Sequence, residues 1–210
     1  MNKPLRVALT KGRLEEKTVA LFERMGYDCS AVRDKGRRLI LPVGNMEFVL
    51  AKAADVITYV ERGVCDIGVV GKDTIMEYGQ SFYEVLDLGF GRCRFALAGP
   101  VGRDFYAGYA GKTVASKYVN VARRYFESRG MDVDVVKIEG SVELAPLLEL
   151  ADAIVDIVET GSTLRENGLE VVEDVAPISA RVIVNLASAK MKKAAIQQVI
   201  SDLESGLEES

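Results

Sequence analysis

The chain alternates short apolar runs with amphipathic segments, and this pattern predicts an α/β protein. The short runs are typical of buried strands. The amphipathic segments predict helices, several of which end before a glycine. The expected strands are 5–9, 39–41, 47–51, 65–70, 95–98, 112–115, 133–138, 153–158 and 181–186. The expected helices are 14–25, 54–62, 75–78, 120–129, 142–150 and 189–207.

Two stretches of the chain share one order of elements, which suggests two lobes. In 46–73 and again in 133–164, a strand, a helix and a second strand follow one another, and an Asp-Ile pair begins the later run. Two similar α/β units facing one another across a cleft are the simplest interpretation. We expect a discontinuous first lobe of residues 1–90 plus 177–210, and a second lobe of residues 91–176.

The most informative stretch runs from Asp156 to Gly168 and reads D-I-V-E-T-G-S-T-L-R-E-N-G. Small hydroxylated residues surround Gly161 between a strand end and a helix start, where backbone N–H groups converge and favour an anion. Asp156 and Glu159 stand at the mouth of this turn and suit sugar hydroxyls. A phosphorylated-sugar site and an ordinary turn capped by Thr or Ser both fit this stretch. The turn consists of Thr160, Gly161, Ser162 and Thr163.

A basic loop follows the first expected strand. Lys11, Gly12 and Arg13 lie at the strand end, which is the edge where open α/β sheets bind ligands. Arginine supplies paired donors suited to phosphate. Solvated surface charge is the alternative, and it also applies to Arg37 in the basic loop expected at 31–38. Glu143 lies in the first turn of an expected helix, where a carboxylate is stabilised with or without a ligand.

Composition excludes several kinds of chemistry. The 210 residues include no histidine, which removes Ser-His-Asp and Cys-His catalysis and the common metal ligand. The three cysteines are scattered without a C-x-x-C motif, as in a reducing cytoplasm without structural zinc. The net charge of −4 argues against nucleic-acid binding. Neither a signal peptide nor a membrane span is expected.

Two glycine motifs fail as nucleotide fingerprints. G-K-T at 111–113 would need a glycine at position 106 for a P-loop, but Tyr106 stands there. G-F-G-R at 89–92 would need a third glycine at position 94, which is Arg94. These glycines instead predict a relaxed backbone where the chain crosses between lobes, within 86–94.

Together the motifs resemble those of the short-form ATP phosphoribosyltransferases, over nearly the whole chain. The matching segments are L-T-K-G-R-L at 9–14, R-R-L-I at 37–40, D-I-G-V-V-G-K-D at 66–73, S-K-Y-V-N-V-A-R-R-Y-F at 116–126, G-S-V-E-L-A-P at 140–146 and D-I-V-E-T-G-S-T-L-R-E-N-G-L at 156–169. The resemblance implies a two-lobed α/β fold like the type II periplasmic binding proteins, with a central cleft and crossing strands between the lobes. It also implies transfer of phosphoribose from phosphoribosyl pyrophosphate to N1 of ATP, the first step of histidine biosynthesis.

The resemblance also assigns roles to residues. The catalytic, charge-handling residues would be Lys11, Arg13 and Arg37, and in related short forms the arginine matching Arg37 reaches the neighbouring subunit's site. The phosphoribosyl pyrophosphate site would comprise Glu143, Asp156, Glu159, Thr160, Gly161, Ser162 and Thr163. The ATP site would comprise Lys11, Gly12, Arg13, Lys52 and Asp73. The family often has Arg where this chain has Lys52.

Further expectations concern cofactors and partners. The resemblance implies Mg²⁺ carried mainly by the substrate phosphates, with no metal ligands from protein side chains. It implies a homodimer within a cytoplasmic hetero-oligomer, whose regulatory subunit resembles histidyl-tRNA synthetase. A long-form regulatory domain of roughly 80 residues has no room beside two lobes. Two rival functions are a solute-binding protein and a phosphosugar-binding regulator, but the chain offers neither a signal peptide nor a helix-turn-helix extension.

Overall fold

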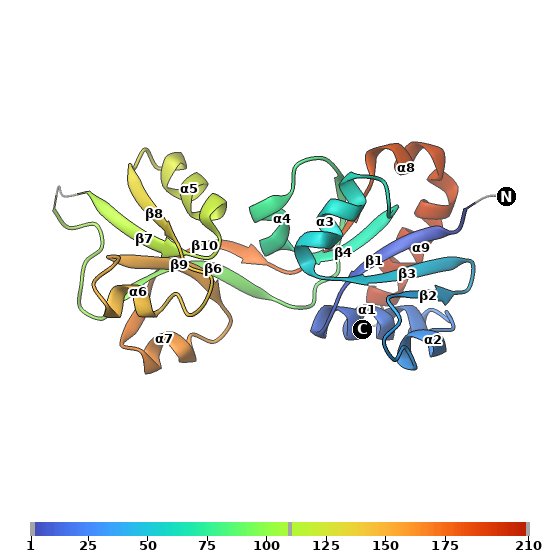
Figure 1. Ribbon diagram of the computed structural model, residues 1–210, viewed down its shortest axis with the longest axis horizontal. Helices are drawn as coiled ribbons and strands as arrows, with labels where there is room; N and C mark the ends of the chain where they lie inside the picture. Colours follow the sequence, from blue (N-terminus) through green and yellow to red (C-terminus); the bar gives the residue numbers. More distant parts are fainter. Residues whose placement is uncertain (1–2, 109–110, 209–210) are drawn as a thin grey trace. The chain divides into compact units, whose positions relative to one another are not determined.

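The computed structural model describes residues 3–108 and 111–208, which form two compact α/β units (Figure 1). The first unit comprises Met1–Gly91 and Ser179–Ser210, and the second comprises Arg92–Ile178. The chain therefore passes from one unit to the other and returns. Its C-terminal segment completes the unit in which the chain began.

The first unit is built on a mixed sheet. Its described strands are β1 (Leu5–Thr10), β2 (Ile40–Val43), β3 (Met46–Ala51), β4 (Ile67–Gly71), β5 (Tyr83–Asp87) and β11 (Ala180–Val184). Its described helices are α1 (Arg13–Arg24), α2 (Ser30–Arg33), α3 (Ala53–Glu61), α4 (Lys72–Tyr78), α8 (Leu186–Met191) and α9 (Lys193–Glu208). The strand order is β2-β3-β1-β4-β11-β5, and β1 runs parallel to both β3 and β4. The loops that follow β1, β3 and β4 consequently lie at one edge of the sheet.

Each face of this sheet has its own hydrophobic core, because side chains alternate along the strands. Val7 and Leu9 of β1 pack with α1 and α9, whereas Ala8 belongs to the core under α3. Figure 1 shows α3 on one side of the sheet and α1 on the other. Gly68 permits the close approach of α3, since a Cβ there would lie 2.8 Å from Val60 Cγ2.

The second unit repeats this strand arrangement. Its described strands are β6 (Cys93–Pro100), β7 (Lys112–Ser116), β8 (Val133–Lys137), β9 (Ala153–Val158) and β10 (Leu169–Ile178), and its described helices are α5 (Val119–Ser128), α6 (Leu144–Leu147) and α7 (Ser162–Glu166). The order is β10-β6-β9-β7-β8, with β7 parallel to β8 and β9. β7 thus corresponds to β1, β8 to β3 and β9 to β4. Helix α5 covers one face of the sheet, and α6 and α7 cover the other (Figure 1).

The pattern of apolar residues did not predict two strands, β10 and β5. Strand β10 pairs with β6 through register shifts between Val171 and Glu173 and between Asp174 and Ala176, so its apolar residues do not alternate regularly. Strand β5 lies at the edge of its sheet and is largely exposed, so it carries no buried stripe. The periodicity on which strand prediction depends is absent from both.

Three helical predictions were also wrong. The loop expected at 31–38 contains most of α2. The helix expected at 142–150 is only α6, because Glu149 adopts a left-handed φ of 58° and ends it without a glycine. Glu143 therefore precedes the helix instead of lying in its first turn. The helix expected at 189–207 is α8 followed by α9, which are separated at Lys192.

A buried carboxylate, Asp66, binds the C-terminal segment at the break between α8 and α9. Asp66 Oδ2 accepts hydrogen bonds from the Arg6 N–H at 2.9 Å and from Lys192 Nζ at 2.8 Å. Its Oδ1 accepts a bond from Ser188 Oγ at 2.7 Å. Asn185 caps α8 and donates to the Val60 carbonyl at 2.7 Å. Asp66 thus joins β1 to the returning C-terminal segment.

Removing this carboxylate should destabilise the protein strongly. We expect Asp66→Ala to lower the free energy of unfolding by about 3 kcal/mol, because it leaves buried donors and the Lys192 ammonium without their partner. Urea denaturation followed by circular dichroism measures this loss. Asp55→Ala, on the exposed first turn of α3, should cost less than about 1 kcal/mol. Equal losses for the two variants would contradict the role given to Asp66.

Candidate functional site

A pocket of about 350 Å³ opens on the second unit where β9 ends and α7 begins. It is lined by Glu143, Asp156, Ile157, Val158, Glu159, Thr160, Gly161, Ser162, Thr163 and Leu164. The lining includes every residue that the family resemblance assigned to phosphoribosyl pyrophosphate. The strand, the turn and the helix are contiguous in sequence, whereas Glu143 comes from the residue before α6.

The turn in this pocket has a defined geometry. Gly161 adopts a left-handed φ of 72°, a conformation that residues with a Cβ rarely adopt. The Thr160 carbonyl accepts a hydrogen bond from Arg165 Nη1 at 3.1 Å, and the Thr160 and Ser162 hydroxyls lie 3.1 Å apart. The Gly161 carbonyl accepts the N–H of Arg165 at 3.2 Å. Two carbonyls of the turn therefore accept hydrogen bonds from Arg165, while Thr160, Ser162 and Thr163 line the pocket.

Asp156 is a half-buried carboxylate in the pocket. Burial raises its pKa to about 6, and the charge of Glu143 acts in the same direction. A hydrogen bond from the Ile157 N–H and the charge of Lys117 lower that pKa. Asp156 is consequently ionised above about pH 6 and can then accept hydrogen bonds from sugar hydroxyls.

The basic residues predicted for ATP lie in the first unit, where parallel strands end. The Lys11 N–H donates to the Ala51 carbonyl at 2.9 Å, which places Lys11 beside Lys52 at the ends of β1 and β3. Gly12 adopts a left-handed φ of 95° immediately before α1, which begins at Arg13. Asp73 lies in the first turn of α4 at the end of β4. The sheet thus brings Lys11, Gly12, Arg13, Lys52 and Asp73 to one edge.

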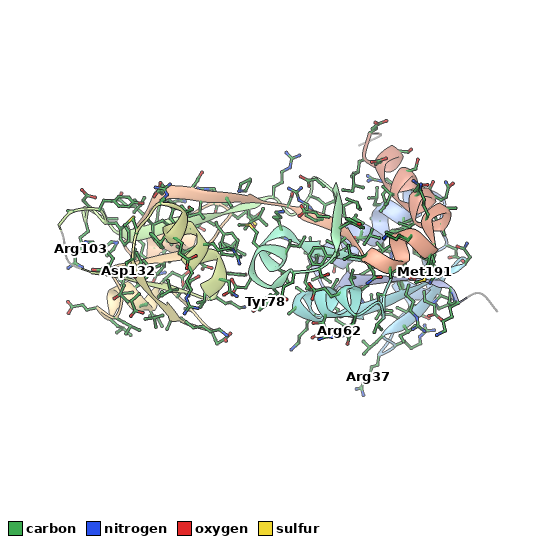
Figure 2. All side chains as sticks on the ribbon, turned by 90° about the horizontal axis from the view of Figure 1, so that it is seen from above. Arg37, Arg62, Tyr78, Arg103, Asp132 and Met191 are labelled. Carbon is green, nitrogen blue, oxygen red and sulfur yellow. The ribbon has the colours of Figure 1, made fainter. Side chains whose placement is uncertain are left out.

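Arg37 has a different setting. It lies in the exposed loop between α2 and β2, and its side chain extends away from the ribbon (Figure 2). Lys35 of the same loop forms an ion pair with the buried Glu15 of α1. The loop is therefore anchored to α1, while the Arg37 side chain is exposed.

Sequence reasoning missed two residues beside the pocket, Lys117 and Arg165. Both fall within motifs that carry the family resemblance. For Lys117 the available signal was its position directly after an expected strand. For Arg165 it was the spacing from Thr160, which allows a side chain in the first helical turn to reach back to the preceding turn.

No ready-made metal centre is found among residues 3–108 and 111–208, since no group of three or more Cys, Asp or Glu side chains there could hold an ion. In the same ranges, no helix is both long and apolar enough to cross a membrane.

Sequence comparisons identify similar proteins over nearly the full chain. The family model described as ATP phosphoribosyltransferase matches residues 52–205. An ATP phosphoribosyltransferase from Clostridium kluyveri is 60% identical over 202 residues, which cover 95% of this chain and 92% of the relative. An ATP phosphoribosyltransferase from Clostridium acetobutylicum is 54% identical over 209 residues, which cover 99% of this chain and 97% of the relative.

Solved structures agree with these comparisons. A chain of the ATP phosphoribosyl transferase (HisG:HisZ) complex from Thermotoga maritima matches with a TM-score of 0.84 and 34% identity, covering 98% of this chain and 100% of that one. The periplasmic aliphatic sulphonate binding protein SsuA from Escherichia coli matches with a TM-score of 0.58 and 12% identity, covering 99% of this chain and 73% of that one. The second likeness concerns the fold alone. The predicted two-lobed fold of the type II periplasmic-binding-protein class is confirmed.

Proposed function

We propose roles for individual residues on the premise that this chain belongs to the ATP phosphoribosyltransferase family. The enzyme transfers phosphoribose from phosphoribosyl pyrophosphate to N1 of ATP, giving N1-(5-phosphoribosyl)-ATP and pyrophosphate in the first step of histidine biosynthesis. We assign phosphoribosyl pyrophosphate to the second unit and ATP to the first.

The pocket of the second unit carries the sugar-phosphate assignment. The hydroxyls of Thr160, Ser162 and Thr163 surround a turn whose Thr160 carbonyl is engaged by Arg165, an arrangement that suits the 5-phosphate. Asp156 lies on the strand that leads into this turn, at a position suited to ribose hydroxyls. The turn suits the phosphate of a phosphorylated sugar, and the neighbouring carboxylates suit its hydroxyls. The presence of both in one pocket is the observation that supports the assignment most.

The reaction requires positioning and charge stabilisation. The C1–O bond to pyrophosphate breaks as the adenine N1 forms its bond to C1, so the sugar gains positive charge and the leaving group gains negative charge. The carboxylates of Asp156 and Glu159 stabilise the sugar cation. Lys11 and Arg13 at the edge of the first sheet stabilise the polyphosphates, and Lys52 and Asp73 orient ATP beside them. None of these roles needs histidine, which the chain lacks.

Magnesium is best placed on the substrates. Mg²⁺ prefers oxygen ligands and commonly binds through one or two carboxylates together with substrate phosphates. The hydroxyls and carboxylates of the pocket suit the phosphate and the sugar of phosphoribosyl pyrophosphate, so an ion that arrives on the phosphates of this substrate needs no ligand from a protein side chain. When bound, the ion offsets phosphate charge.

The proposed assembly is a homodimer within a hetero-oligomer in the cytoplasm. The Thermotoga maritima chain comes from a HisG:HisZ complex, which supports a regulatory partner for this chain. We propose that this partner resembles histidyl-tRNA synthetase. The outward direction of Arg37 is compatible with a role in a neighbouring subunit's site (Figure 2).

A product assay tests the function. The chain is purified with and without its co-expressed regulatory subunit and mixed with ATP, phosphoribosyl pyrophosphate and Mg²⁺. We expect N1-(5-phosphoribosyl)-ATP and pyrophosphate in equal amounts by mass spectrometry. Binding of phosphoribosyl pyrophosphate without product in either preparation would instead support a solute-binding protein.

A hydroxyl deletion tests the phosphate assignment. We expect Thr163→Ala to raise the dissociation constant for phosphoribosyl pyrophosphate about tenfold, because a hydrogen bond to a charged phosphate is lost. Isothermal titration calorimetry should show an unchanged dissociation constant for ATP. Thr163→Ser keeps the hydroxyl and serves as the control. Equal weakening of both substrates by Thr163→Ala would rule out this assignment.

A further inference from the structure

The sheet register of the second unit places Lys117 beside Asp156. Strands β7 and β9 run parallel, with Ala115 opposite Ile154. Two residues further along each strand direction come Lys117, just after the end of β7, and Asp156 in β9. Because side chains alternate between faces, this pair lies on the same face of the sheet as Ala115 and Ile154. That face carries α6 and α7, and therefore the pocket.

Contacts on both sides of Lys117 extend this register beyond the last residue of β7. Ser116 is buried, and its Oγ donates to the Val155 carbonyl at 2.6 Å. The same Oγ accepts the Tyr118 N–H at 2.9 Å. The Tyr118 ring packs edge-on against Phe95 of β6, with 4.9 Å between ring centroids. The backbone of Lys117 is thus held between two anchored neighbours.

The pocket needs a positive charge. Its described lining contains the carboxylates Glu143, Asp156 and Glu159 but no Lys or Arg. A substrate that carries a phosphate and a pyrophosphate is negatively charged, so these carboxylates would repel it. Lys117 is exposed and next to Asp156 in the register, so its ammonium group can approach that carboxylate and offset part of this negative charge.

We propose that Lys117 is a positioning residue of this pocket, whose ammonium group offsets the negative charge around Asp156 and keeps that carboxylate directed at the sugar. The inference rests on the proposed function, because it takes Asp156 to contact the ribose. It assigns Lys117 no bond-making role. Its effect on catalysis passes through Asp156.

The electrostatics of the surrounding elements agree with this role. Lys117 at the end of β7 lowers the pKa of Asp156, in opposition to burial and to Glu143 before α6. From β6, Arg94 is paired with Asp174 at 2.5 Å and also donates to the Glu159 carbonyl at 3.5 Å. From α7, Arg165 is bonded to the Thr160 carbonyl. Lys117 also lowers the pKa of Glu139, whose main partner is Lys137.

The pH dependence of kcat/KM for phosphoribosyl pyrophosphate tests the proposal. In Lys117→Met the acidic limb should move to higher pH, so the loss of kcat/KM relative to wild type should be about threefold greater near pH 5.5 than near pH 8, as expected for loss of one partly exposed charge. Lys117→Arg should restore the wild-type profile. Lys112→Met removes the same charge about 17 Å away along β7 and should leave the profile unchanged.

Other outcomes overturn the inference. These are an unchanged profile in Lys117→Met, a uniform loss at every pH, an equal displacement in Lys112→Met, or a wild-type profile without an acidic limb. In the double variant Lys117→Met with Asp156→Asn, we expect no pH-dependent loss of kcat/KM beyond that of Asp156→Asn alone. If Lys117→Met caused the same pH-dependent loss in the Asp156→Asn background as in the wild type, the proposal would be wrong. Failure of the proposed function is distinguishable, since the wild-type protein would then form no product at any pH.

Discussion

Gly161→Ala is expected to raise the dissociation constant for phosphoribosyl pyrophosphate about 30-fold, equivalent to about 2 kcal/mol. The left-handed φ of 72° costs a residue with a Cβ about 1–2 kcal/mol. The new Cβ would also lie 3.3 Å from Arg165 Nη1, so the bond between Arg165 and the Thr160 carbonyl would be disturbed. The hydroxyls would then lose the arrangement that suits phosphate. Calorimetric titrations with each substrate measure the effect.

Gly130→Ala is the matched control for backbone strain. Gly130 follows α5 in the same unit with a φ of 67°, and a Cβ there would meet nothing within 4 Å. We expect this variant to lose a similar free energy of unfolding but to bind phosphoribosyl pyrophosphate like the wild type. If both glycine variants weakened binding equally, the effect would come from general destabilisation and not from the pocket.

Arg13→Ala is expected to lower kcat about 100-fold, with a smaller change in KM for ATP. The negative charge on pyrophosphate grows as the C1–O bond breaks, so a guanidinium beside it stabilises the transition state more than bound substrates. Steady-state kinetics with both substrates varied separate the two parameters.

Arg24→Ala provides the control for Arg13. Arg24 lies in the last turn of the same helix, about 16 Å along its axis from Arg13. We expect it to leave kcat within about twofold of wild type. A rise in KM for ATP without loss of kcat in Arg13→Ala would show that Arg13 only binds ATP.

The pocket of the second unit was largely predictable because its chemistry is local. The aspartate, the turn glycine and the hydroxyls follow one another along a single strand–turn–helix segment, 156–163. Lys117 was missed because its relation to Asp156 depends on the register between two strands that are distant in sequence. Sequence spacing carries no information about such a register until the strands are paired.

The limits of the fold prediction have similar causes. Buried strands such as β9 were predicted because their residues form short, mostly apolar runs. The long strand β10 was missed because its bulges remove the alternation. The break between α8 and α9 could not be predicted from helix periodicity, because it accompanies contacts between Lys192 and the distant Asp66. Local patterns thus predicted local elements, and long-range polar contacts changed their ends.

The central claim is that the turn at 160–163 holds the 5-phosphate of phosphoribosyl pyrophosphate. A crystal structure of the chain with this substrate tests it most directly. We predict phosphate oxygens within hydrogen-bonding distance of the Thr160, Ser162 and Thr163 hydroxyls, with Asp156 on the ribose side. A 5-phosphate held instead by the loop of Lys11–Arg13, with the pocket of the second unit free of substrate, would contradict the account.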